Sequence, residues 1–197
     1  MRYENNKKKD EVNKNLLEEE LFKNRTVMIF GEITQELARE VSAKLLLLSS
    51  DSEEEIKVFI NSPGGHVEAG DTIFDVIQFV EPRVRVIGTG WVASAGSLIY
   101  AAPPKERRFC LPNTRFMLHQ PSGGVGGSTS DVKIEVEELL KMRHRLNAIF
   151  ATQTGQPLEK IKSDSDRNFW MSAEEAIEYG LVGRVIRSLG ELVSCRK

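Results

Sequence analysis

The sequence predicts an α/β protein in which helices cover a largely parallel sheet, and three observations support this prediction. Short β-branched runs alternate with longer segments whose apolar residues recur at i, i+3, i+4 and i+7. Strand, helix and strand follow one another at lengths typical of a right-handed βαβ unit, whose two strands run parallel. A long charged segment near residue 140 carries a narrow apolar stripe, which indicates a helix that projects from the sheet domain.

The composition predicts one globular domain and gives no support for nucleic acid or membranes as partners. The 197 residues are 40% apolar and 28% charged, enough to bury one substantial core, and a net charge of −2 creates no strong field. The first residues lack the apolar core of a signal peptide, and the longest weakly polar run, 91–104, is too short to span a bilayer. We therefore expect a cytoplasmic protein in which Cys110 and Cys195 are separate thiols rather than a disulfide.

The N-terminal part is predicted to be a flexible segment over residues 1–20, followed by a packed domain over 21–197. The first 20 residues contain few large apolar groups to offset the entropy of ordering. The first strand of the domain is "TVMIF" at 26–30. The helix after it has Thr34 as its N-cap and apolar residues at helical spacing through Leu48.

Two further strands flank a second predicted helix. "IKVFI" at 56–60 leads through the turn "NSPGG" into a helix that Pro82 ends, and "VRVIGTG" at 84–90 is the next strand. A small-residue helix is expected from Ser94 to about Ala102, after which "PPKERR" makes an exposed loop. This order repeats the βαβ pattern.

The second half of the chain predicts a strand, a loop and a long helix. "RFML" at 115–118 is the strand, and four glycines within 123–127 indicate a flexible loop or edge segment. The segment 131–151 is predicted to be an amphipathic helix, with an apolar stripe that needs a second subunit to pack against. Its stripe consists of Val132, Val136, Leu139, Leu140, Arg143 and Phe150.

Ser94 is a candidate nucleophile because it lies at a predicted strand-to-helix junction. The first N–H groups of a helix have no partner within it and can hold an oxyanion. The small neighbours Ala93, Ala95 and Gly96 leave the backbone open to a substrate. The alternative is a helix N-cap, which the local pattern alone favours.

A nucleophilic serine needs a base, and the chain contains three histidines. His144 lies on the charged helix and His66 in a turn after "SPGG", so a surface position explains both. His119 ends the strand "RFML" at the carboxyl edge of the sheet, where sites of α/β proteins assemble. From this pattern alone, a structural histidine is as well supported as a catalytic base.

Four motifs follow one another along the chain: "INSPGGHVEAG", "GWVASAGS", "RFCLPNTRFMLHQPSGG" and "SDRNFWMSAEEAIEYGLV". Together they resemble the signatures of the ClpP family, the peptidase component of ATP-dependent bacterial proteases, and the resemblance covers the chain from about Leu21 to Ile186. It implies a ClpP/crotonase-like fold of repeated β-β-α units, with a parallel-sheet head and a protruding handle over about 122–151.

The resemblance also implies functions for individual residues. Ser94 matches the family's nucleophile and His119 its base, and the backbone N–H groups of Gly65 and Ala95 match its oxyanion hole. The sequence also supports the assignment of Gly65 independently, because a Pro-Gly-Gly turn has no side chain that would keep a substrate from its backbone N–H groups. The resemblance implies no metal and no cofactor in this subunit.

The third member of the family's triad is an aspartate, and Asn168 stands at its position here. If the oxygen of Asn168 accepts a hydrogen bond from His119, the imidazole keeps its orientation without the charge. If the amide group donates instead, His119 has the wrong tautomer and the serine is not deprotonated. Asp164 and Asp166 are the nearby carboxylates, but the motif's register argues against both.

Three other features concern specificity and assembly. Ala95 stands where the family usually has methionine, which enlarges the neighbouring pocket. Asp166 and Arg167 match family positions that pair across two rings, so the resemblance implies that they are inter-ring contacts. The polar segment "NNKKKDEVNK" does not match the family's apolar N-terminal hairpin, which leaves axial gating open.

The implied assembly is two stacked seven-membered rings, formed by this chain, a second ClpP paralogue, or both. A Clp ATPase such as ClpX or ClpC would dock on the rings and consume the ATP, and the substrates would be unfolded proteins. Three hypotheses follow: a serine peptidase that is weak alone and active in a mixed complex, a non-catalytic ring subunit, and an acyl-CoA enzyme of the related crotonase superfamily.

Overall fold

One sheet of seven strands organises the computed structural model, which describes residues 15–124 and 126–194. Five of its strands are parallel, in the order β1-β2-β3-β4-β7, as predicted. A sixth, β5, runs parallel to the end of β3, and β6 pairs antiparallel with β5. The bounds are β1 Thr26–Phe30, β2 Ile56–Ser62, β3 Val84–Ala93, β4 Arg108–Cys110, β5 Arg115–Leu118, β6 Phe169–Met171 and β7 Arg184–Val185.

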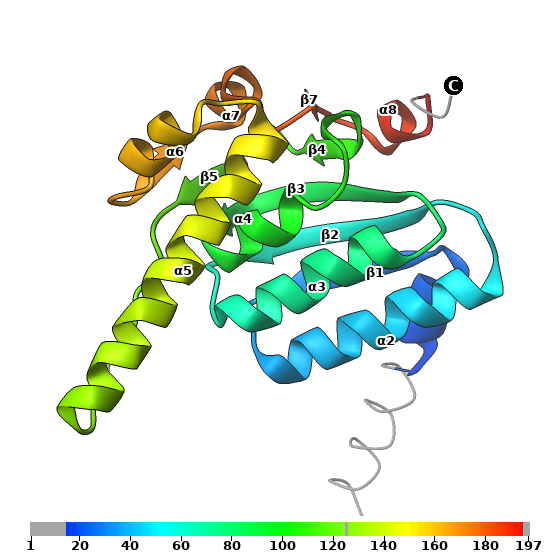
Figure 1. Ribbon diagram of the computed structural model, residues 1–197. Coiled ribbons are helices and arrows are strands. Elements are labelled where there is room, and N and C mark those ends of the chain that lie inside the picture. Colours follow the sequence, from blue (N-terminus) through cyan, green and yellow to red (C-terminus); the bar gives the residue numbers. More distant parts are fainter. Residues whose placement is uncertain (1–14, 125, 195–197) are drawn as a thin grey trace, which may run out of the picture.

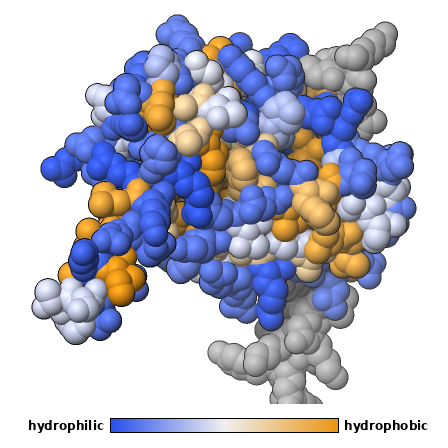
Figure 2. Space-filling view, in the orientation of Figure 1, coloured by the Kyte–Doolittle hydropathy of each residue, from blue (hydrophilic) through white to orange (hydrophobic). Residues whose placement is uncertain are grey.

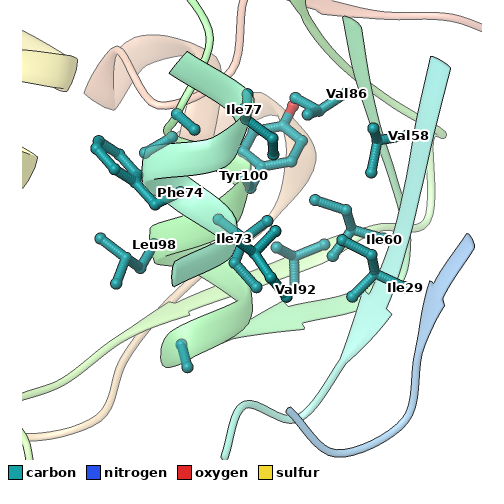
Figure 3. Packing of buried hydrophobic residues seen from close by; sticks show 14 of the residues in the cluster. Ile29, Val58, Ile60, Ile73, Phe74, Ile77, Val86, Val92, Leu98 and Tyr100 are labelled. Atoms are coloured by element: carbon teal, nitrogen blue, oxygen red, sulfur yellow. The ribbon is translucent and has the colours of Figure 1, made fainter. Parts of the chain in front are cut away.

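Three helices pack on one face of the sheet and form the main core with it (Figure 1). They are α2 (Gln35–Asp51), α3 (Val67–Phe79) and α4 (Ala95–Tyr100). Figure 3 shows Ile73 of α3 next to Val92 of β3, on the side of the helix that faces Ile60 of β2. Thr34 caps α2 as predicted, because its side chain accepts a hydrogen bond from the N–H of Leu37. This packing holds the ends of β2 and β3 in place.

The third strand is three residues longer than predicted and changes neighbours along its length. Its first part pairs with β4, and Trp91–Ala93 pair with β5. Gly90 lies between the two parts at φ +62, a conformation that glycine adopts without strain. The strand therefore continues to Ala93, immediately before Ser94.

The long helix α5 (Thr129–Thr154) projects from the head (Figure 1). Only its inner part is buried, through Leu146, Asn147 and Phe150. Its outer part exposes Ile134, Val136 and Leu140, and hydrophobic surface lies along the projecting arm in Figure 2. The predicted stripe is thus divided between the core and an uncovered surface.

The predicted exposed loop at 103–108 is wrong for its first and last residues, because Pro103 and Arg108 are both buried. Residues 105–107 form a 3-10 turn, but Arg108 begins β4 and is fully buried. Its guanidinium donates hydrogen bonds to the carbonyls of Pro103, at 2.6 Å, and of Gln153, at 2.8 Å. Burial lowers the pKa of Arg108 to about 10. These carbonyls explain why a cation can lie inside the fold.

Three short helices complete the C-terminal part: α6 (Leu158–Asp164), α7 (Ala173–Tyr179) and α8 (Leu189–Ser194). A capping box starts α7, in which Ser172 and Glu175 bond to each other's backbone N–H groups. Hydrogen bonds to the Glu175 carboxylate lower its pKa. This cap fixes the chain just after β6.

The N-terminal prediction falls mostly on residues 1–14, which lie outside the described residues. Residues 15–23 form a helix with Leu16 and Leu17 exposed, so part of the segment predicted to be flexible is helical. Cys110 is buried as a free thiol, and Cys195 also lies outside the described residues. No helix in the described part of the chain has the length and hydrophobicity to cross a membrane.

Candidate active site

Ser94 lies at the junction between β3 and α4, in a strained backbone conformation. Its φ is +54 and its ψ −122, which is unusual for a residue with a side chain. The hydroxyl makes no capping hydrogen bond to α4, so the N-cap function that the local pattern favoured is wrong. The strained junction instead lifts the side chain off the sheet.

The Pro-Gly-Gly turn at the end of β2 leaves room for this hydroxyl. A Cβ added to Gly64 would lie 2.5 Å from Ser94 Cβ, and one added to Gly65 would lie 2.3 Å from the carbonyl oxygen of Ile33. Both glycines also have positive φ, at +101 and +151. No other residue type fits at either position without displacing the backbone.

His119 is the histidine that lies against Ser94. Its Nε2 is 2.7 Å from Ser94 Oγ, within hydrogen-bonding distance. It follows β5 directly, and β5 pairs with the last residues of β3, so the sheet itself brings the two side chains together. His66 and His144 are both exposed, and His66 Nδ1 is 3.2 Å from Glu68 Oε2.

Asn168 contacts the other side of the same imidazole. Its Oδ1 lies 3.2 Å from His119 Nδ1, and the side chain is exposed. The contact follows from the β5–β6 register, in which Leu118 is opposite Phe169. When Nδ1 carries the proton, it can donate to Oδ1 at this distance, and Nε2 is then free to accept the hydrogen of the Ser94 hydroxyl. Of the two predicted orientations of Asn168, the structure has this one.

Two backbone N–H groups belong to the residues that follow Ser94 and Gly64, and a Cβ added to Gly64 would lie 3.0 Å from Ser94 Oγ. Ala95 is the first residue of α4, so its N–H has no partner within the helix. Ile33 bonds to the carbonyl of Gly64 and to the N–H of His66, which leaves the N–H of Gly65 between them unused by this pairing. Among the described residues neither N–H has an acceptor, and both can donate to an oxyanion.

An apolar pocket opens next to Ser94 between the head and the inner part of α5. The small side chain of Ala95 forms part of its wall, and a Cβ added to Gly70 would lie only 3.2 Å from Ala95 Cβ. α3 and α4 are therefore in close contact behind the pocket. The lining residues are Val67, Ser94, Ala95, Leu98, Leu118, His119, Pro121, Leu146 and Phe150.

The two predicted inter-ring residues precede Asn168. Asp166 makes an ion pair within its own chain, with its Oδ1 3.0 Å from Arg143 Nη2 on α5. Arg167 is exposed and has no hydrogen bond or ion pair with the described residues. Their inter-ring function stays a prediction. The described residues contain no cluster of three or more His, Cys, Asp or Glu side chains that could hold a metal.

The sequence pattern does not indicate which residues hold this loop. Gln120 donates to the carbonyl oxygen of Asp166 at 2.7 Å, and Arg143 carries the charge opposite Asp166. Gln120 is part of the "HQP" motif, which was the available signal. Arg143 had been placed on the apolar stripe of the helix.

The chain matches a family model described as Clp protease over residues 8–189. A relative named "ATP-dependent Clp protease proteolytic subunit 3", from Rhizobium johnstonii, is 58% identical over 175 residues, 89% of this chain and 90% of the relative. One named "proteolytic subunit 2", from Gluconobacter oxydans, is 60% identical over 178 residues, 89% of this chain and 80% of the relative.

Solved structures show the same similarity. An asparagine-to-aspartate mutant of ClpP1 from Listeria monocytogenes has a TM-score of 0.84 and 53% identity, covering 89% of this chain and 99% of that one. ClpP1 from the same organism has a TM-score of 0.81 and 54% identity, with the same coverage.

Proposed function

The chain belongs to the Clp protease family, and from that premise we propose that it is a serine endopeptidase subunit acting through Ser94, His119 and Asn168. The observation that supports this most directly is the 2.7 Å contact between His119 Nε2 and Ser94 Oγ. A nucleophile paired with a base, which a third group orients, is the arrangement that acyl transfer requires.

In the proposed mechanism His119 first acts as a base. Nε2 takes the hydroxyl proton while Ser94 Oγ attacks the carbonyl carbon of the peptide bond. The N–H groups of Gly65 and Ala95 donate to the resulting oxyanion, where a single donor contributes roughly 10²–10³ in rate. His119 then gives its proton to the leaving amine, and the amine departs. Water repeats the sequence on the acyl-enzyme and frees Ser94.

Asn168 makes this site weaker than one with an aspartate. Its amide oxygen keeps the imidazole in the productive tautomer, as the contact with Nδ1 indicates. It has no charge to stabilise the imidazolium that forms when His119 takes the proton. We therefore propose low activity for the chain alone and higher activity in a mixed assembly with a second ClpP.

The pocket beside Ser94 favours substrates with an apolar side chain before the cleaved bond. Its walls include Leu98, Leu146 and Phe150, and the small side chain of Ala95 lies beside them. Unfolded proteins expose such side chains, whereas folded proteins bury them. Peptide segments of unfolded proteins are therefore the proposed substrates.

The exposed apolar surface on α5 supports the proposed ring assembly. Ile134, Val136 and Leu140 lie on the projecting part, which a neighbouring subunit would cover. We propose stacked heptameric rings of this chain, a second ClpP, or both, with a Clp ATPase supplying unfolded substrate and consuming ATP. ClpX and ClpC stay the predicted kinds of partner, and the cytoplasm stays the predicted compartment.

A non-catalytic ring subunit is the second candidate function. It is favoured by the neutral, exposed Asn168, whose contact with His119 is 0.5 Å longer than that of Ser94 (3.2 against 2.7 Å). The acyl-CoA hypothesis has less support, because that chemistry does not require a serine paired with a histidine. The contact that the structure shows would then have no purpose.

The deciding experiment combines labelling, mass and peptidase activity. The full chain is purified alone and mixed with a second ClpP, its mass in solution is measured, and Ser94 is exposed to a fluorophosphonate. We expect labelling in the mixed complex and at least about a tenfold gain in peptidase activity for Asn168→Asp, because a carboxylate restores the missing charge. Absence of labelling in every preparation, with Ser94→Ala as the background, would favour the non-catalytic subunit.

A further inference from the structure

The loop before β6 is fastened to the residue that follows His119. The backbone N–H of Gln120 donates to the carbonyl oxygen of Ser165 at 2.6 Å. Its side-chain Nε2 donates to the carbonyl oxygen of Asp166 at 2.7 Å and lies 3.4 Å from Asp166 Oδ1. His119 and Gln120 are adjacent, and Asn168 follows Asp166 by two residues. The hydrogen bonds of Gln120 therefore lie directly beside the contact between His119 and Asn168.

The inner part of α5 holds the same loop from the opposite side. Arg143 Nη2 lies 3.0 Å from Asp166 Oδ1, and the Ser165 hydroxyl is 3.1 Å from Asn147 Oδ1 in a buried position. Figure 1 shows α5 running past α6, which leads into this loop. The loop thus has no freedom to shift without breaking contacts to α5 or to Gln120.

This support matters more for an asparagine than it would for an aspartate. A carboxylate would attract the imidazolium and hold the loop through a charge-assisted hydrogen bond, which is roughly twice as strong as a neutral one. The amide of Asn168 is neutral and exposed, so its bond to His119 competes with water. Its position must come from the neighbouring residues.

Resting on the proposed function, we propose that Gln120 and Arg143 are positioning residues that hold Asn168 against His119. Neither side chain touches the reacting atoms. Gln120 acts through the backbone of Asp166, and Arg143 acts through the carboxylate of the same residue. Misplacement of a catalytic group by about 1 Å can cost on the order of 10² in rate.

The test is a double-mutant cycle on the full chain, in whichever preparation labels faster, alone or mixed with a second ClpP. Fluorophosphonate labelling of Ser94 and the kcat and KM of a fluorogenic peptide are measured for Gln120→Ala, Arg143→Gln and Asn168→Ala. We expect the first two to lower kcat and the labelling rate about three- to tenfold with KM within twofold. In the Asn168→Ala background, Gln120→Ala and Arg143→Gln should lower neither kcat nor the labelling rate any further, because the group that they position is gone.

Two control variants separate positioning from folding and from charge. Arg143→Lys keeps a cation opposite Asp166 and should recover most of the rate. Lys141→Gln removes a positive charge from the same helix, where Lys141 pairs with the exposed Glu138, and should leave the rate within twofold. Melting temperature and mass in solution are compared for every variant.

The outcomes distinguish this inference from the proposed function. The positioning function is wrong if Gln120→Ala and Arg143→Gln lower kcat and the labelling rate as much in the Asn168→Ala background as in protein with Asn168. It is also wrong if the two variants leave both rates unchanged. In both cases Ser94 is still labelled, and the peptidase function stands. Failure to label Ser94 in any preparation would overturn the proposed function and this inference with it.

Discussion

The two sides of His119 are built differently. On the Ser94 side, the imidazole meets a half-buried hydroxyl at 2.7 Å, at the end of strands that lie in the core. On the Asn168 side it meets an exposed amide at 3.2 Å, on a loop held by polar contacts. The first side depends on sheet register and hydrophobic packing. The second depends on hydrogen bonds at the surface, which contribute less and are more easily lost.

The two halves of the site therefore differ in how they tolerate change. The nucleophile and its base cannot separate without disrupting β3 and β5, so this half of the site is as stable as the fold. The orienting group moves only when its loop breaks polar contacts to Gln120 and α5, each of which contributes less than the packing of the core. Changes on the Ser94 side should therefore have large effects, and changes on the Asn168 side should have smaller, graded ones.

Replacing the nucleophile should have the largest effect. Ser94→Ala removes the oxygen that forms the acyl-enzyme, and we expect loss of peptidase activity by at least about 10³-fold with no covalent labelling. The melting temperature should not fall, because the hydroxyl makes no capping bond. Labelling of the variant protein at another serine would show that Ser94 is not the nucleophile.

Crowding the hydroxyl should have the next largest effect. Gly64→Ala places a Cβ 2.5 Å from Ser94 Cβ, so we expect about a 10²-fold lower labelling rate. Gly31→Ala is the matched control, because Gly31 also has positive φ (+86) but its added Cβ would meet nothing within 4 Å. Equal losses of labelling in the two variants would show that backbone strain, and not the space around Ser94, causes the effect.

Removing the orienting amide should have a moderate effect. Asn168→Ala leaves the contact between His119 and Ser94 in place but no longer fixes the tautomer, so we expect kcat to fall about tenfold with KM unchanged. Steady-state kinetics with a fluorogenic peptide measure both constants. A loss as large as that of Ser94→Ala would remove the distinction between the two sides of His119.

The smallest expected effect concerns β4, which pairs with the first part of the strand that leads to Ser94. Cys110 on β4 is opposite Gly88 of β3, and burial raises the pKa of its thiol to about 12. About 10⁻⁴ of the thiol is then ionised at pH 8, so alkylation should be negligible in the native protein and complete in urea. Mass spectrometry of the peptide with Cys110 measures both. Rapid native alkylation would show that the Ser94 side opens more readily than its packing indicates.

Most of the head could be predicted because its signals are local. The runs "TVMIF" and "IKVFI" and the helix capped by Thr34 follow from patterns within a few residues. The end of β3 could not be predicted, because pairing with β5, more than twenty residues away, extends it to Ala93. Arg108 was misplaced for a similar reason, since its acceptor on Gln153 is 45 residues distant.

The candidate site divides along the same line. A local pattern placed Ser94 at the strand-to-helix junction but favoured an N-cap hydrogen bond that its hydroxyl does not make. Whether a serine caps a helix depends on the orientation of its side chain, which the local pattern does not contain. Asn168 was identified by resemblance to family motifs and not by its own surroundings. Gln120 and Arg143 escaped notice because their contacts to Asp166 span 46 and 23 residues.

The buried guanidinium of Arg108 limits how the projecting arm can respond to force. It bonds to the carbonyl and the side-chain amide of Gln153, one residue before the end of α5. Sliding the helix along its axis would strip a buried cation of its acceptors, at about 1–3 kcal/mol for each group left unpaired. The C-terminal end of α5 is therefore fixed to the head, and a force applied to the outer end should bend the outer turns of the helix.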